Sequence, residues 1–264
     1  MILSSVIIVL REVLEAALLI SLLLALSHFL RIPSRWLLVA IAIGLIGAAL
    51  YAHYLGPISD WFDGTGQEIV NAVLQIVLAI MLLVCVPLWI LRKYFNALTL
   101  CMTASITMAI VREGSEIVVY VSGFMSSREL FLPVLLGGAI GLGIGASVGA
   151  LTYFALSSLE QRPFTIAVLS LSALVAAGFT SQAMNLLIQA DWLTATNPVW
   201  DSSSWLPEDT VVGQLLYALI GYEATPTLIQ VLVYSSVIVG FAVVSAICYR
   251  QVRPAPPTIS SPAK

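Results

Sequence analysis

The segment 98–123, LTLCMTASITMAIVREGSEIVVYVSG, is an apolar run of the length that crosses a bilayer, and it carries a charged motif inside the run. A membrane-spanning helix needs about 20 predominantly apolar residues. The segment 2–27, ILSSVIIVLREVLEAALLISLLLALS, repeats this design with the same motif, R-E-x-x-E. Together the two segments indicate a helical membrane protein that places charges inside the bilayer.

The composition of the whole chain supports a membrane protein. Its 264 residues are 60% hydrophobic and 9% charged, whereas soluble domains carry about 25% charged residues. This excludes an ordinary soluble enzyme and a disordered chain. The balance of 11 Lys and Arg against 14 Asp and Glu also excludes the basic surface of a nucleic-acid-binding protein.

The apolar runs predict an all-α integral membrane protein with seven transmembrane helices. The predicted spans are 2–27, 36–55, 69–91, 98–123, 131–158, 164–190 and 226–249. They form a single transmembrane domain over 1–264, with an outer loop over about 191–225 and a disordered cytoplasmic tail over 250–264. Within the outer loop, the apolar segment 211–222 is too short to cross and is expected to be re-entrant or interfacial.

The loop charges predict the orientation. One set of loops holds eight basic residues and one acid: Arg31, Arg35, Arg92, Lys93, Arg162, Arg250, Arg253 and Lys264, with Glu160. The alternate set holds nine acids and one base: Asp60, Asp63, Glu68, Glu129, Asp191, Asp201, Glu208, Asp209 and Glu223, with Arg128. Since cytoplasmic loops carry the excess of Lys and Arg, we expect the N-terminus outside and the C-terminus in the cytoplasm.

Six charged residues remain inside predicted spans: Arg11, Glu12, Glu15, Arg112, Glu113 and Glu116. Each costs about 2.5–3.5 kcal/mol at the centre of a membrane helix. Arg11 and Glu15 are spaced to pair on one helix face, and Glu12 and Glu15 are spaced to converge. If the two helices face each other, four carboxylates meet two guanidiniums, which suits a hard cation such as Fe³⁺, Mn²⁺ or Mg²⁺. The competing interpretation is that the charges form salt bridges that only hold helices together. Such bridges need one acid per arginine, whereas each motif carries two acids.

The two motifs also indicate an internal repeat. Each motif lies in the first of three spans, so repeat one covers about 1–95 and repeat two about 96–190, with the seventh helix added. Because three is odd, the second repeat must be inverted. Many transporters share this plan and bind substrate at the midplane between repeats. Small residues recur every fourth position in equivalent spans: Ala40, Gly44, Ala48 and Ala52, and Gly137, Gly141, Gly145 and Gly149. Such stripes allow close helix approach.

Two polar faces are predicted to lie in the outer half of the membrane. They share the spacing i, i+3, i+7 and consist of Glu68, Asn71 and Gln75, and of Gln182, Asn185 and Gln189. We interpret them as an access path to the glutamates. Interhelical hydrogen bonding is an equally weighted interpretation of the same residues.

The chain resembles the high-affinity, oxidase-coupled iron permeases of yeast and bacteria. The first motif, R-E-V-L-E at 11–15, and the second, R-E-G-S-E at 112–116, are similar to that family's paired R-E-G-L-E motifs. Gln67-Glu68-Ile69, Ala176-Ala177-Gly178 and the segment 221–226, GYEATP, also match. Relatives often carry a second acid at the position of Asn71 and His-Glu at Ile188-Gln189.

The resemblance implies a function and its residues. It implies a permease whose transported substrate is iron, with Glu12, Glu15, Glu113 and Glu116 as metal ligands and Arg11 and Arg112 in support. It further implies a bacterial inner (plasma) membrane location, no tightly bound organic cofactor, and Fe³⁺ supplied by a periplasmic iron-oxidising or iron-binding partner that is cupredoxin-like or peroxidase-like.

Three further functions are compatible with intramembrane glutamates. A membrane-embedded undecaprenyl-pyrophosphate phosphatase-like enzyme would share inverted repeats and such glutamates, but its Ser-rich segment and its R-G-x-S-R-type phosphate clamp are missing from the sequence. The second is transport of another heavy metal such as lead or manganese, and the third is a scaffold that transports nothing. We expect a transporter and not an enzyme.

Overall fold

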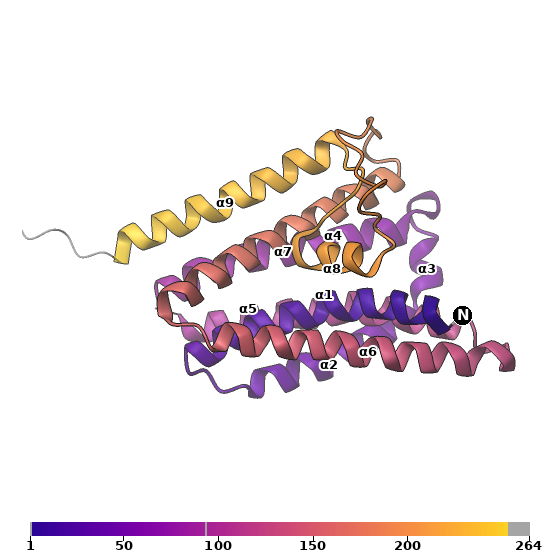
Figure 1. The fold of residues 1–264 in the computed structure, drawn as a ribbon, viewed down its shortest axis with the longest axis horizontal. Coiled ribbons are helices and arrows are strands. Elements are labelled where there is room, and N and C mark those ends of the chain that lie inside the picture. The colour runs from indigo at the N-terminus through magenta and orange to yellow at the C-terminus, as the bar shows by residue number, and fades with distance from the viewer. Residues whose placement is uncertain (1, 93, 253–264) are drawn as a thin grey trace, which may run out of the picture.

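The computed structural model describes residues 2–92 and 94–252, and the regular elements in these ranges are helices (Figure 1). They are α1 (Ile2–Phe29), α2 (Arg35–His53), α3 (Leu55–Ser59), the 3₁₀ turn η1 (Phe62–Gly64), α4 (Gly66–Ile90), α5 (Phe95–Ser122), α6 (Arg128–Ser157), α7 (Gln161–Gln189), α8 (Val211–Ile220) and α9 (Leu228–Val252). Of the predicted tail, residues 250–252 continue α9, and 253–264 lie outside the described residues.

Six of the described helices are long and apolar enough to cross a membrane, namely α2, α4, α5, α6, α7 and α9. This confirms a multi-pass membrane protein. The first predicted span corresponds to α1, which has 28 residues and carries one of the charged motifs, but it is not one of the six. The prediction of seven spans therefore depends on α1. The short helix α8 has the apolar character expected of the segment 211–222.

The long helices pack in pairs. α1 packs along α6, α2 along α5 and α4 along α7, while α9 packs on α7 and α4. Both predicted small-residue stripes lie at these contacts. A Cβ atom at Gly141 would lie 2.7 Å from the Val6 carbonyl oxygen of α1, and one at Gly44 would lie 2.8 Å from Cβ of Ile110 on α5. Larger residues at these positions would therefore push the paired helices apart.

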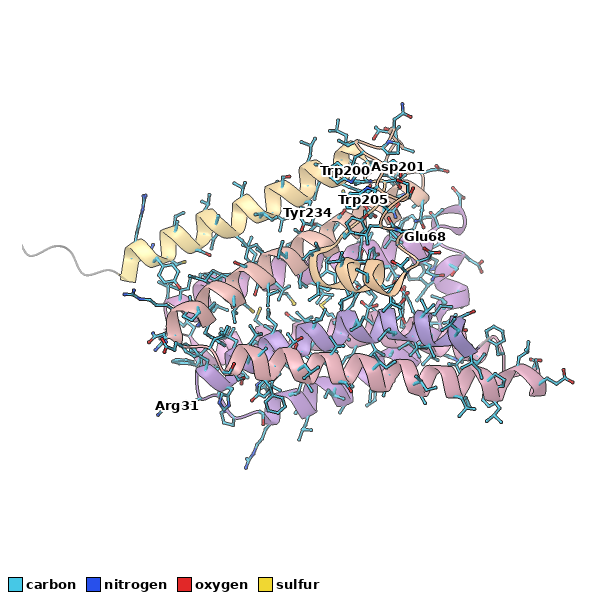
Figure 2. All side chains as sticks on the ribbon, viewed as in Figure 1. Arg31, Glu68, Trp200, Asp201, Trp205 and Tyr234 are labelled. Atoms are coloured by element: carbon cyan, nitrogen blue, oxygen red, sulfur yellow. The ribbon has the colours of Figure 1, made fainter. Side chains whose placement is uncertain are left out.

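The two ends of the bundle differ in charge. The end where α1, α4, α6 and α9 finish holds Arg31, whereas the other end holds Glu68 and α3 (Figures 1 and 2). We call these the arginine-rich end and the acidic end, after the charges of the loops found at each.

The segment between α7 and α9 is an ordered cap at the acidic end. The hydroxyls of Ser202 and Tyr222 are 2.7 Å apart, and Tyr222 donates to the Leu206 carbonyl at 2.9 Å. The apolar helix α8 lies within this cap and packs against both α1 and α7. The cap therefore brings residues remote in sequence next to the first R-E-x-x-E motif.

Candidate metal site

Helices α1 and α5 bring the two R-E-x-x-E motifs together. Arg112 on α5 donates from Nη1 to Glu15 Oε2 on α1 at 3.1 Å, and also to Glu113. Its Nε lies 3.8 Å from Oε1 of Glu116, the ion pair that the i, i+4 spacing predicts. Arg112, Glu15 and Glu113 are all buried. The motifs therefore form one shared ionic cluster rather than two separate ones.

Three of the glutamates could hold a metal ion together. Glu12, Glu113 and Glu116 each offer a carboxylate oxygen, and these oxygens lie within 4.8 Å of one another. Oxygen atoms of Glu12 and Glu113 are buried without a hydrogen-bond donor, as is one oxygen of Glu15. Burying such atoms without a partner is unfavourable, and a hard cation would satisfy them because it prefers oxygen ligands.

The pairing of the first arginine differs from the prediction. The spacing predicts a pair between Arg11 and Glu15, but Nε of Arg11 contacts Glu12 Oε1 at 3.1 Å. Glu15 instead accepts from Arg112 on the neighbouring helix. The side chain of Arg11 extends toward α8, where its guanidinium carbon lies 5.5 Å from the centre of the Tyr217 ring. Helical spacing allows the predicted pair, but the approach of α5 places a second guanidinium at Glu15.

A cavity of about 530 Å³ borders this cluster and reaches residues of the acidic end. It is lined by Arg11, Arg112 and Glu116 of the motifs. All six predicted access residues also line it: Glu68, Asn71, Gln75, Gln182, Asn185 and Gln189. A smaller cavity of about 250 Å³ borders Glu12, Glu116 and Arg11 beside α8. The structure thus places both polar faces around one cavity together with Arg11, Arg112 and Glu116 of the motifs.

Hydrogen bonds hold several of the access residues in place. Asn71 donates from Nδ2 to Glu116 Oε1 at 3.4 Å, and its own Oδ1 accepts from the Tyr51 hydroxyl at 3.0 Å. Gln75 donates from Nε2 to Gln182 Oε1 at 2.6 Å, joining α4 to α7. Asn71, Gln75 and Gln182 therefore bond between helices as the second interpretation expects. All six residues also line the cavity, and the access path stays a prediction.

Tyr51 is a positioning residue that sequence reasoning does not find. In an apolar span, one tyrosine gives no signal of the residue it will meet. Its hydroxyl fixes the Asn71 amide, which in turn donates to the Glu116 carboxylate. The three residues come from α2, α4 and α5, so this chain of two hydrogen bonds forms only once these helices have packed.

Replacing Tyr51 by phenylalanine is expected to raise the apparent KM for cation uptake about two- to tenfold, because one hydrogen bond contributes about 0.5–1.5 kcal/mol. The maximal rate and the thermal unfolding midpoint should change little. Uptake kinetics in proteoliposomes would measure this split. Tyr54→Phe is the matched control, since Tyr54 is exposed and 55% accessible. An unchanged KM in Tyr51→Phe would show that the Tyr51 hydroxyl does not position Asn71 and Glu116.

Two acids of the cap also line the cavity, Glu208 and Glu223. Glu208 Oε1 accepts from the Ala224 backbone N–H at 2.5 Å, and Glu223 accepts from Gln230 and, at 3.5 Å, from Ser181. The loop charges predict that both acids lie on the outer side, but nothing in their spacing links them to the site.

A close glycine contact positions the loop that carries Glu223. Gly221 has φ 65°, a left-handed conformation that favours glycine. A Cβ atom there would lie 2.3 Å from Cα of Gly178 on α7. Both glycines belong to segments that resemble the iron permeases. Their lack of side chains lets the loop lie against α7 beside the cavity.

The Glu223 carboxyl is expected to make cation uptake depend on pH. Burial, with the charge of Glu208, raises the pKa of Glu223 to about 7. Below that pH the group is protonated, so the cavity loses one negative charge and attracts cations less. The apparent KM should therefore rise about three- to fivefold as the pH falls through 7. Glu223→Gln should flatten this difference, and a wild-type pH profile in that variant would contradict the assignment.

Comparison with known proteins assigns the family. A search of curated proteins and a search of solved structures find no match. The model of the iron permease FTR1 family matches residues 95–253, which is more than half of the chain. The matched region runs from α5 to α9 and includes the second R-E-x-x-E motif, Gly178 and the loop that carries Glu223. The chain therefore belongs to the iron permease FTR1 family.

Proposed function

We propose that this chain transports iron through the ionic cluster between α1 and α5. The observation that carries the proposal is the group formed by Glu12, Glu113 and Glu116, whose oxygens lie within 4.8 Å of one another. Glu15 is the fourth ligand candidate, since one of its oxygens is buried without a donor. Four carboxylates and two guanidiniums give a net charge near −2, which attracts a cation.

In this proposal the two arginines hold the carboxylate ligands in position for metal binding. Arg112 contacts Glu15, Glu113 and Glu116, and Arg11 contacts Glu12. Without these guanidiniums, like charges would face each other in a medium of low dielectric constant. The arginines thereby reduce repulsion in the absence of metal, while the carboxylates remain in excess.

The proposed substrate form is Fe³⁺, supplied by a periplasmic iron-oxidising or iron-binding partner. Oxygen ligands without a nearby thiolate or imidazole favour hard cations, and the described glutamate group consists of carboxylates alone. We further propose an inner-membrane location with the acidic end outside, because positively charged loops stay in the cytoplasm. The acidic residues around the cavity would then meet iron first.

The helix pairs support the proposed inverted repeats with seven spans. An exchange of the two repeats maps α1, α2 and α4 onto α5, α6 and α7. This exchange converts the α1–α6 pair into the α5–α2 pair and maps the α4–α7 pair onto itself. The structure contains all three of these helix pairs. In this proposal α1 crosses the membrane as α5 does, and the ion site lies at the repeat interface.

The contacts of the motif arginines do not favour the alternative function, a membrane-embedded phosphatase. A phosphatase of lipid pyrophosphates needs cationic groups that are free to bind phosphate, whereas both motif arginines, although they line the cavity, form ion pairs with glutamates. Transport of lead or manganese would use the same carboxylate ligands. Competition between these metals and iron in the uptake assay distinguishes this alternative.

Metal uptake by purified protein in liposomes tests the proposed function. We expect accumulation of radioactive iron that empty liposomes lack, and competition by other metals would rank its selectivity. Supply of Fe²⁺, with and without an added ferroxidase, would decide the oxidation state. Iron accumulation no greater than in empty liposomes would contradict transport.

Glu68 is expected to act at the outer part of the cavity. Glu68→Gln should raise the apparent KM more than it lowers the maximal rate, because it removes attraction and leaves the cluster intact. About a three- to fivefold change is expected for one charge. Uptake kinetics over a range of iron concentrations would show this, with the exposed Glu129→Gln as control. Loss of transport at saturating iron would instead place Glu68 in the central site.

A further inference from the structure

A second large cavity lies away from the metal site, at the arginine-rich end. Its volume is about 690 Å³, and its residues come from the end of α4, the start of α7 and the ends of α1 and α9. Its wall is apolar and includes Phe29, Trp89 and Leu169. Arg92, Arg162 and Tyr249 stand at its polar parts. We call this space the arginine groove.

The two arginines of the groove are not held in ion pairs by the described residues. Both are exposed, and within residues 2–92 and 94–252 no carboxylate forms an ion pair with either of them. The Arg92 guanidinium carbon lies 6.0 Å from the centre of the Phe29 ring. That ring stacks on buried Phe164 with 4.4 Å between centroids. The groove therefore presents fixed aromatic surface directly beside positive charge.

We propose that the arginine groove binds an anionic phospholipid, with the phosphate between Arg92 and Arg162 and the acyl chains along the apolar wall. Guanidinium groups hydrogen-bond phosphate oxygens with matching geometry. Basic pockets between membrane helices on the cytoplasmic side suit anionic headgroups. The exposed Ile166 continues the apolar wall on the outer surface of α7, which offers a place for acyl chains. A free anion would use the arginines but leave this apolar wall without an occupant.

Native mass spectrometry of the purified protein tests this proposal. Incubation with phosphatidylglycerol should give a bound lipid that an equal amount of phosphatidylcholine does not give. The double variant Arg92→Gln, Arg162→Gln should reduce the occupancy about tenfold or more, because each arginine contributes to headgroup attraction. Leu169→Trp fills the wall without removing charge, and it should also reduce lipid binding.

The matched control is Arg31→Gln, Arg35→Gln, which removes two exposed charges at the same end. Neither residue lines the groove, and Figure 2 shows Arg31 on the side of the bundle opposite α9. This control should keep wild-type lipid occupancy. Equal loss in both double variants would overturn the proposal, because it would show only general charge attraction. Displacement of the lipid by millimolar inorganic phosphate, or equal binding of phosphatidylcholine, would overturn it as well.

Discussion

Iron uptake is expected to fall to background when Glu113 is replaced by glutamine. The substitution keeps the shape of the side chain and removes the charge of a carboxylate that lies with Glu12 and Glu116. Loss of a residue that only supports a metal ligand costs about 10–100-fold, so loss of a direct ligand should exceed about 100-fold. Initial uptake rates in proteoliposomes, normalised to inserted protein, would measure it.

A charge-matched control separates this effect from a general loss of negative charge. Glu160→Gln removes an exposed carboxylate between α6 and α7, far from both motifs in sequence, and should retain wild-type uptake. Glu12→Gln should behave like Glu113→Gln. Wild-type uptake in either motif variant, at equal expression, would show that the carboxylate group is not the transport site.

Replacement of Arg112 is the second change with a large expected effect. Arg112→Ala leaves Glu15, Glu113 and Glu116 without their shared partner. Breaking a buried ion pair from one side costs about 3–5 kcal/mol, so both the thermal unfolding midpoint and uptake should fall. Arg112→Lys keeps the charge but loses the planar guanidinium that reaches three carboxylates. We expect it to insert and to transport iron more slowly.

The lysine variant makes this prediction specific. If Arg112 only neutralised charge, lysine would restore both stability and uptake. If geometry matters, stability should recover further than uptake does. Full activity in Arg112→Ala, measured in the same proteoliposome assay, would show that the arginine is dispensable.

The sequence predicted that the two charged motifs could meet, and in the structure they do, for a physical reason. Charges inside apolar spans have few possible partners, so the motifs on α1 and α5 had to meet each other or a cavity. The two amide faces followed from the same reasoning, and the structure places all six of those residues at one cavity. The match of the iron permease FTR1 family then confirmed the family that the motifs suggested.

The sequence could not predict contacts that depend on the approach of separate helices. The pairing of Glu15 with Arg112, rather than with Arg11, follows from the position of α5. The link from Tyr51 through Asn71 to Glu116 needs three packed helices. Glu223 reaches the cavity because two glycines let its loop lie against α7. None of these contacts leaves a pattern in local spacing.

The location of bound iron tests the central claim most directly. Anomalous scattering at the iron edge from crystals of purified protein grown with iron should show one strong peak enclosed by Glu12, Glu113 and Glu116. Glu113→Gln crystals treated identically should lose that peak, and metal analysis should show a matching drop in iron per protein. A peak elsewhere, or equal iron content in the variant, would contradict the account.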